Sequence, residues 1–172
     1  MKFTKFFAFA LGLVSFFSCG PKQTETAGDL PVALQLYTVR DDMGADFLGT
    51  LQKVKEMGYD GVEFAGLFGH EPKQVNEWCE SVGLVPISAH VPFDEMVNDI
   101  DKVIADYKTV GCEYIVVPYV SEECHPDGAN FLQMVKDIRT WGEKANAAGL
   151  TLLYHNHDFE FKKFENGQVG LD

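Results

Sequence analysis

Basic residues are scarce in this chain of 172 residues. Lysine and arginine together number 14, against 26 aspartates and glutamates, so the formal net charge is −12. A chain this acidic is repelled by nucleic acid and by anionic membrane surfaces, because both carry dense negative charge. We therefore expect no nucleic-acid partner, and any membrane attachment has to come from something other than charge.

Cysteine is also scarce, with four residues in the whole chain. No two of them have the short spacing of metal ligands, and the three after residue 30 are an odd number, so the sequence predicts no disulfide framework. Cys79 falls on an apolar helical stripe, which indicates core packing. Cys124 and His125 are adjacent and could contact a metal, but an ordinary loop is the favoured interpretation.

No apolar run approaches the roughly 20 residues that a membrane-spanning helix needs. The short run FFAFALGLVSFF follows Lys2 and Lys5 and precedes Ser18 and Cys19. A basic start, a short apolar stretch and a small residue before the cut are typical of a secretory signal. The cysteine directly after Ser18 indicates a bacterial lipoprotein signal at 1–19, with Cys19 as the lipidated N-terminus. The alternative is a plain cleaved signal in which Cys19 has no role.

The signal has consequences for location and charge. Residues 20–30 are polar, contain Pro and Gly, and read as a linker. Losing Lys2 and Lys5 with the signal would take the net charge from −12 to −14. We expect an exported, membrane-anchored lipoprotein of the bacterial cell envelope, periplasmic or surface-facing, that is held to the membrane through its lipid anchor only.

A phosphate-binding glycine fingerprint is missing after the first predicted strand, where YTVRDDMGADF holds a single glycine. This argues against a nucleotide-binding doubly wound fold. What the chain has instead is a repeating unit. Four times an amphipathic helical pattern ends at a glycine and runs into a short apolar segment. The glycines are Gly58, Gly83, Gly111 and Gly149.

This alternation predicts an α/β fold with a parallel sheet and right-handed crossovers. Strands are expected near 32–37, 61–64, 85–90, 114–118 and 150–155, with four helices between them. The preferred architecture is a TIM (β/α)8 barrel, which has eight such units. Because the pattern stops after the fifth strand, we expect residues 31–172 to form a partial barrel of about five βα units that lacks the last three.

In such a barrel the chemistry gathers where the strands end. Polar groups stand at these ends on otherwise apolar strands, which is what a shared pocket would produce. For each residue taken singly, a strand-end group that meets solvent is the favoured interpretation, and it is their coincidence that favours a pocket. The strand-end residues are Gln35, Tyr37, Glu63, His90, Tyr119, His155 and His157.

The last strand is followed by the richest group of these residues. His155 and His157 are two positions apart, so on a strand they would point the same way. Imidazole is a common ligand of zinc, manganese or iron, and a nearby carboxylate often orients it. Asp158 and Glu160 could supply that carboxylate or could face water. Two histidines alone cannot hold a catalytic metal ion, so other ligands would be needed.

Several motifs resemble those of the sugar phosphate isomerase/epimerase family, the xylose-isomerase-like barrels. They run from about Val32 to the end of the chain, and the last is the most specific: LQLYTVRD, MGYDGVEF, SAHVPF, YIVVPYV and GLTLLYHNHDFEF. Secreted lipoprotein members of this family also exist. The resemblance implies a barrel with a divalent metal at its mouth that assists proton transfer beside a sugar carbonyl.

The same resemblance assigns roles to four residues. His155 takes the place of a metal ligand on strand five that is often glutamate in the family, His157 that of a substrate contact, and Glu63 and His90 match pocket-lining positions. The implied metal is manganese, magnesium, cobalt or zinc, and this chain need not bind it. The family's other ligands and its second catalytic carboxylate lie on strands that have no counterpart here, so the catalytic residues stay unassigned.

We therefore expect a metal-dependent sugar isomerase or epimerase-like protein that acts on a small sugar or keto-sugar and is inactive as this chain. Two alternatives remain open. One is a lyase of the same fold that performs β-elimination on a keto-sugar or glycoside, and the other is a carbohydrate-binding lipoprotein without catalysis. The related metal-dependent DNA repair nucleases share the barrel, but the acidity and the export signal argue against them.

Overall fold

The computed structural model describes residues 30–171, and Pro31–Asp172 forms one compact unit. The predicted lipoprotein signal at 1–19, its Cys19, and all of the predicted linker at 20–30 except Leu30 lie outside the described residues. Within residues 30–171, no helix combines the length and the apolar character that crossing a bilayer requires.

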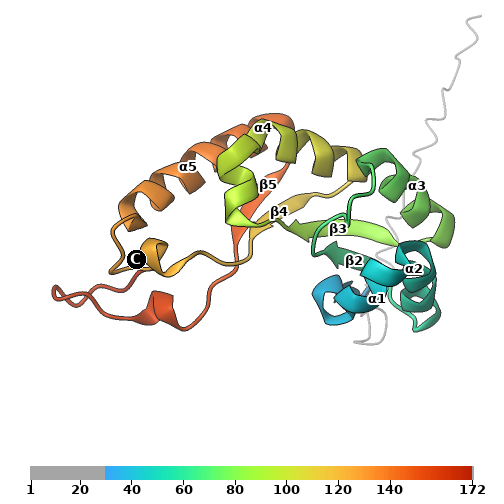
Figure 1. Ribbon diagram of the computed structural model, residues 1–172, viewed down its shortest axis with the longest axis horizontal. Helices are drawn as coiled ribbons and strands as arrows, with labels where there is room; N and C mark the ends of the chain where they lie inside the picture. The colour runs from blue at the N-terminus through green and yellow to red at the C-terminus, as the bar shows by residue number, and fades with distance from the viewer. Residues whose placement is uncertain (1–29, 172) are drawn as a thin grey trace, which may run out of the picture. The chain divides into compact units, whose positions relative to one another are not determined.

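Five parallel strands form a single sheet, in the order in which they occur along the chain (Figure 1). This confirms the predicted α/β fold class and the partial barrel. The strands occupy nearly the predicted positions: β1 Ala33–Gln35, β2 Gly61–Phe64, β3 Val85–His90, β4 Tyr114–Val117 and β5 Thr151–Tyr154. Since neighbours are parallel, all five carboxyl ends lie at one edge of the sheet.

The four predicted helices connect these strands, and α3, α4 and α5 follow one another in an arc along one side of them (Figure 1). Their bounds are α2 Phe47–Glu56, α3 Pro72–Val82, α4 Phe93–Val110 and α5 Phe131–Ala148. Short elements that the sequence did not predict accompany them: η1 Leu36–Val39, α1 Arg40–Ala45, η2 Glu122–Cys124 and η3 Phe159–Phe161.

The ends of the helices follow from particular residues. Gly83, Gly111 and Gly149 close α3, α4 and α5 with φ angles of 75°, 98° and 87°, a left-handed conformation that a Cβ atom would disfavour. At the N-terminal end of α2, the Asp46 carboxylate accepts a hydrogen bond from the N–H of Gly49. Such a cap satisfies one of the N–H groups that the first turn leaves open.

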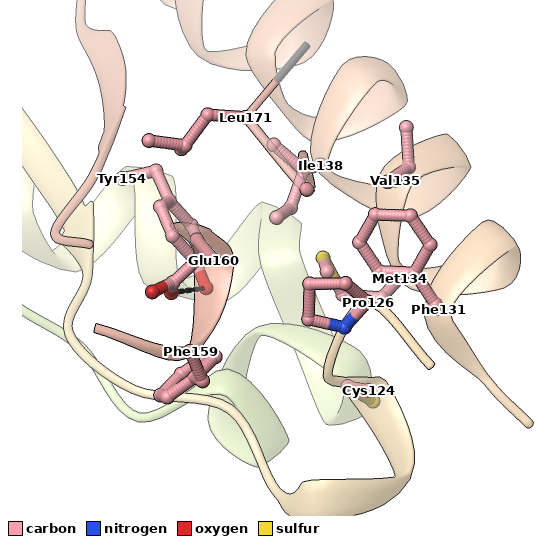
Figure 2. Close-up of a pocket in the computed structure, with 11 residues that line it drawn as sticks. Cys124, Pro126, Phe131, Met134, Val135, Ile138, Tyr154, Phe159, Glu160 and Leu171 are labelled. Atoms are coloured by element: carbon pink, nitrogen blue, oxygen red, sulfur yellow. Dashed lines mark hydrogen bonds between the residues drawn. The ribbon is translucent and has the colours of Figure 1, made fainter. Parts of the chain in front are cut away.

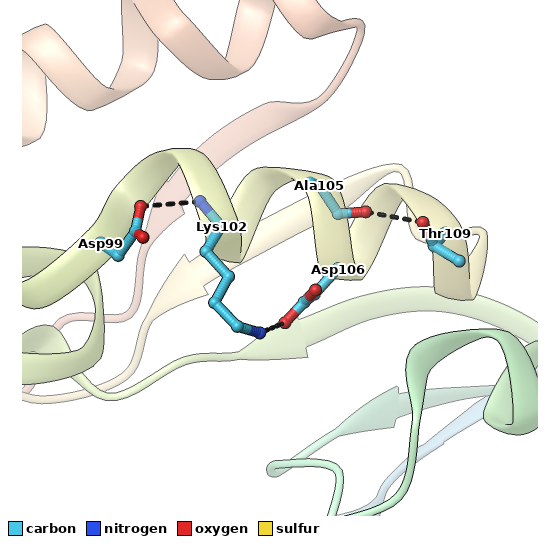
Figure 3. Close-up of polar contacts among 5 residues, drawn as sticks. All are labelled: Asp99, Lys102, Ala105, Asp106 and Thr109. Atoms are coloured by element: carbon cyan, nitrogen blue, oxygen red, sulfur yellow. Dashed lines mark hydrogen bonds and ion pairs between the residues drawn. The ribbon is translucent and has the colours of Figure 1, made fainter.

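Helix α4 is kinked at Asp99, whose φ of −159° and ψ of 83° are not helical (Figure 3). The Asp99 carboxylate accepts a hydrogen bond of 2.9 Å from the N–H of Lys102, so it caps the second half of the helix. One turn later Lys102 pairs with Asp106, and the hydroxyl of Thr109 donates to the carbonyl of Ala105 at 2.8 Å. The Asp99 side chain therefore supplies an acceptor for one backbone N–H that follows the kink.

The hydrophobic core lies between the helices and one face of the sheet. Val62, Phe64, Ile115 and Val117 point into it and are fully buried. The helices contribute apolar side chains from the stripes seen in the sequence, all of them buried: Leu51, Val54, Val75, Cys79, Met96, Ile104, Met134 and Trp141. This packing fixes which strand residues face the helices, and so leaves the alternate residues on the opposite face.

Candidate functional site

A cavity of about 690 Å³ opens at the carboxyl ends of the strands. Its size falls within the roughly 300–1,000 Å³ of typical small-ligand pockets. The predicted strand-end residues His90, His155 and His157 all reach it. The full lining is Gln35, Tyr37, Thr38, Ala65, Gly66, His90, Pro92, Glu95, Pro118, Tyr119, His155 and His157.

Glu63 and His90 lie in close contact beside this cavity. Nε2 of His90 lies 3.1 Å from Oε1 of Glu63, and the hydroxyl of buried Ser88 donates to the other carboxylate oxygen. Glu63 thus does not line the cavity itself but contacts His90, which does. Both oxygens of the carboxylate have a protein partner, which holds it in one orientation.

A register irregularity brings these groups together. Val62 pairs with Pro86, but the next residue, Glu63, pairs with Ser88, so Ile87 is skipped. A one-residue shift changes which side chains share a face of the sheet. Without it Glu63 would stand opposite an apolar residue. With it Glu63, Ser88 and His90 lie on the face that the helices leave uncovered, and Gln35 continues the row on β1.

The pKa of His90 is lowered from its usual 6.5, first because burial disfavours the charged imidazolium. The Glu63 carboxylate opposes this effect, and the neighbouring His155 adds to it. His90 is therefore favoured as the neutral imidazole near neutral pH. A neutral ring has one donor and one acceptor nitrogen. Because Nε2 faces Oε1 of Glu63 at 3.1 Å, a proton on Nε2 suits this contact and would leave Nδ1 as the acceptor.

His155 and His157 lie together in the same cavity, but not for the predicted reason. β5 ends at Tyr154, so neither residue is on the strand. The N–H of His155 still donates to the carbonyl of Val117 at 3.0 Å, which prolongs the strand pairing by one bond. The two imidazole centroids are 5.0 Å apart, and that of His155 lies 5.1 Å from that of His90.

Aromatic rings surround His157. Its imidazole stacks parallel to the Phe159 ring, with centroids 5.4 Å apart and planes 8° apart. Tyr119 meets the imidazole edge-on at 5.4 Å, and His125 stacks on the far side of the cluster against Phe159 at 3.6 Å. Tyr119 is 52% exposed and presents apolar surface to the cavity. A sugar ring has apolar C–H faces that such a surface can contact.

The residues present do not make a complete metal site. Within residues 30–171, no group of three or more His, Cys, Asp or Glu side chains is placed to share one metal ion. Catalytic zinc sites use three protein ligands. Two buried nitrogens in the described chain, Nδ1 of His157 and Nε2 of Gln35, have no hydrogen-bond partner. Both residues belong to the cavity lining, so each has an unused hydrogen-bonding nitrogen there, which suits a hydroxylated ligand.

Other polar residues near the site escaped the sequence reasoning. Ser88 lies within an otherwise apolar strand and contacts Glu63, and Glu95 lies in the first turn of α4 and lines the cavity, but neither was predicted as a site residue. Glu160 was expected either to orient a histidine or to face water, and it is only 3% exposed. It borders a second, smaller cavity of about 200 Å³ between α5 and the segment after β5 (Figure 2).

No family model and no curated protein sequence matches the chain. Among solved structures it is similar to a sugar phosphate isomerase/epimerase from Parabacteroides distasonis ATCC 8503, with a TM-score of 0.62, 22% identity, and coverage of 81% of this chain and 55% of that one. The fold is that of the xylose isomerase-like TIM barrels.

Two further structures share this barrel fold. An AP endonuclease, family 2, from Brucella melitensis has a TM-score of 0.60 at 15% identity over 73% of this chain and 55% of its own. The IolI protein, solved with a zinc atom, has a TM-score of 0.56 at 16% identity over 73% of this chain and 51% of its own. The chain thus spans about half the length of these barrels.

Proposed function

We propose that the cavity binds a small ketose or keto-sugar, and that the chain carries the part of a sugar isomerase/epimerase-type active site formed by the first five strands. The observation that supports this most is the convergence of His90, His155 and His157 on one cavity, with Glu63 bonded to His90. These residues come from β2, β3 and the segment that follows β5, so the sheet has to form before they meet.

The chemistry follows from the Glu63–His90 pair. A carboxylate held against an imidazole can accept a proton, hold it and return it, which is what an isomerisation or epimerisation beside a carbonyl requires. Neutral His90 offers an acceptor nitrogen while Glu63 fixes its tautomer and orientation. The unsatisfied nitrogens of Gln35 and His157 provide hydrogen-bonding capacity for substrate hydroxyl or carbonyl oxygens.

A divalent metal ion belongs to the proposal for a complete barrel, in which His155 would be one ligand. Because the described residues contain no complete set of ligands, we expect no isomerase turnover from this chain alone. The anchor at Cys19 and the location in the cell envelope are also part of the proposal. The net charge of −12 favours a sugar over nucleic acid as the ligand.

A carbohydrate-binding role without catalysis is the second candidate. Exposed Tyr37 and Tyr119 both line the cavity, at 60% and 52% exposure, and could contact a sugar ring from two sides. This role requires only contact surface and hydrogen bonds. It predicts similar affinity for sugars with and without a carbonyl group.

Calorimetry of the 172-residue chain distinguishes the isomerase-type site from the non-catalytic sugar-binding site. We expect D-fructose to bind with saturable heat that EDTA leaves unchanged, and D-glucitol, which lacks the carbonyl, to bind at least about tenfold more weakly, a difference of about 1.4 kcal/mol. The exposed variant Glu165→Gln serves as a control and should bind like the parent. Product analysis should find no epimerised sugar.

Equal affinity for D-fructose and D-glucitol would favour the non-catalytic role. Absence of any binding heat would contradict a sugar site at the cavity. Metal-dependent epimerisation that is lost in His155→Ala would show that the chain completes a metal site, contrary to the expected lack of turnover.

A further inference from the structure

Glu160 is a buried carboxylate that the proposed chemistry does not use. It lies in η3, which the segment 155–158 separates from β5, and only 3% of it is exposed. It does not line the cavity at the strand ends but borders the smaller one beside α5. A buried charge is costly unless hydrogen bonds compensate it, so its partners indicate what it does.

The two oxygens of Glu160 have two different partners. The Tyr154 hydroxyl at the end of β5 donates to Oε1 at 2.6 Å, and Figure 2 shows these two side chains turned toward each other. The backbone N–H of His157 donates to Oε2 at 2.7 Å. The backbone carbonyl of Glu160 in turn accepts a bond of 2.8 Å from the N–H of Gly170. The carboxylate thus links the last strand residue to a histidine of the cavity.

The bond to His157 comes where the backbone leaves the sheet. The last pairing bond of this region is made by His155, so the strand no longer fixes the orientation of His157. The Glu160 carboxylate replaces that constraint. It fixes the backbone from which the imidazole extends to stack on Phe159 and approach His155. Charge-assisted hydrogen bonds of this kind are short and strong.

Tyr154 supports the same arrangement. Burial first, and then its hydrogen bond to Glu160, raise the pKa of the Tyr154 hydroxyl above its ordinary value of 10.0. A phenol is protonated at neutral pH in any case, so the Tyr154 hydroxyl is available as the donor to Oε1 that the geometry shows. With Tyr154 held on Oε1, the other oxygen faces His157.

We propose that Glu160 is a positioning residue for His157: its buried carboxylate sets the backbone of His157, and so the place of the imidazole in the cavity. The effect on ligand binding rests on the proposed function, but the effect on His157 itself does not. Glu160 acts through His157 and does not touch a ligand.

Three variants of the full chain test this by NMR and calorimetry. Glu160→Leu removes both acceptors, Glu160→Gln keeps one carbonyl oxygen, and Tyr154→Phe removes only the other partner. In Glu160→Leu we expect the amide of His157 to shift upfield and to lose at least about tenfold in protection against hydrogen exchange. Glu160→Gln should restore most of the protection, and Tyr154→Phe should leave the His157 amide and ring signals nearly in place.

The variant that loses more His157 amide protection should also lose more affinity for D-fructose. We expect a loss of at least about tenfold in Glu160→Leu and of less than about threefold in Glu160→Gln. If Glu160→Leu does not fold, the comparison of Glu160→Gln with Tyr154→Phe still decides. Glu160→Gln exchanges the charged acceptor of the His157 N–H for a neutral carbonyl oxygen, so it should shift the His157 amide signal part of the way, whereas Tyr154→Phe should not. Unchanged His157 signals in Glu160→Gln, or equal shifts in Tyr154→Phe, would overturn the proposal. Failure of the parent chain to bind D-fructose would instead count against the proposed function.

Discussion

Replacing Phe64 by alanine is expected to lower the free energy of unfolding by about 3–5 kcal/mol. Phe64 is fully buried at the end of β2, between the sheet and its helices. Its ring stacks on that of Phe47 in α2, with centroids 6.4 Å apart and planes 8° apart. The substitution removes a large apolar side chain and leaves a cavity that the close-packed neighbours cannot fill.

Urea denaturation followed by circular dichroism measures this loss. Phe161→Ala is a matched control, because this phenylalanine is 57% exposed and its loss should cost under about 0.5 kcal/mol. Equal destabilisation by the two substitutions would contradict the placement of β2 in the middle of the core. Since Phe64 follows Glu63, the same result also bears on which face of β2 carries the carboxylate.

The second large effect concerns the cavity. His157→Ala should weaken binding of D-fructose by at least about tenfold, the loss expected when one well-placed hydrogen bond and its packing are removed. The imidazole lines the cavity, and its buried Nδ1 has no partner within the described chain. Calorimetry on the variant at a fixed pH provides the comparison.

His125→Ala is the control for this prediction. His125 belongs to the same aromatic cluster, where it stacks on Phe159 at 3.6 Å, but it does not line the cavity. Its loss should change the affinity by less than about twofold. If the two histidine variants lose equal affinity, the effect comes from a general loosening of the cluster, and His157 has no particular contact with the sugar.

Most of the fold is predictable from the sequence because its signals are local. Helical stripes, closing glycines such as Gly83 and Gly111, and short apolar segments each depend on a few neighbouring residues. β1 is shorter than expected because the chain turns into η1 at Leu36, and α1 follows without an apolar stripe to announce it. Boundaries of this kind depend on tertiary packing, which the local pattern does not contain.

The candidate site was predictable in outline only. That strand ends meet at one rim follows from parallel topology, and His90, His155 and His157 lie there as expected. The contact between Glu63 and His90 depends on the register irregularity that skips Ile87, which no local pattern reveals. The position of Glu160 could not be predicted either, because its burial is decided by the turn after β5.

The proposed site requires that His90 at the end of β3 and His155 just after β5 lie close together at one rim. Proton cross-relaxation between their ring protons measures this contact directly. Their ring centroids lie 5.1 Å apart, although the residues are far apart in sequence. We predict a direct cross-peak between the two rings in the 172-residue chain, and further cross-peaks from both to bound D-fructose. A spectrum that shows the His155–His157 contact but no His90–His155 contact would contradict the convergence on which the proposed function depends.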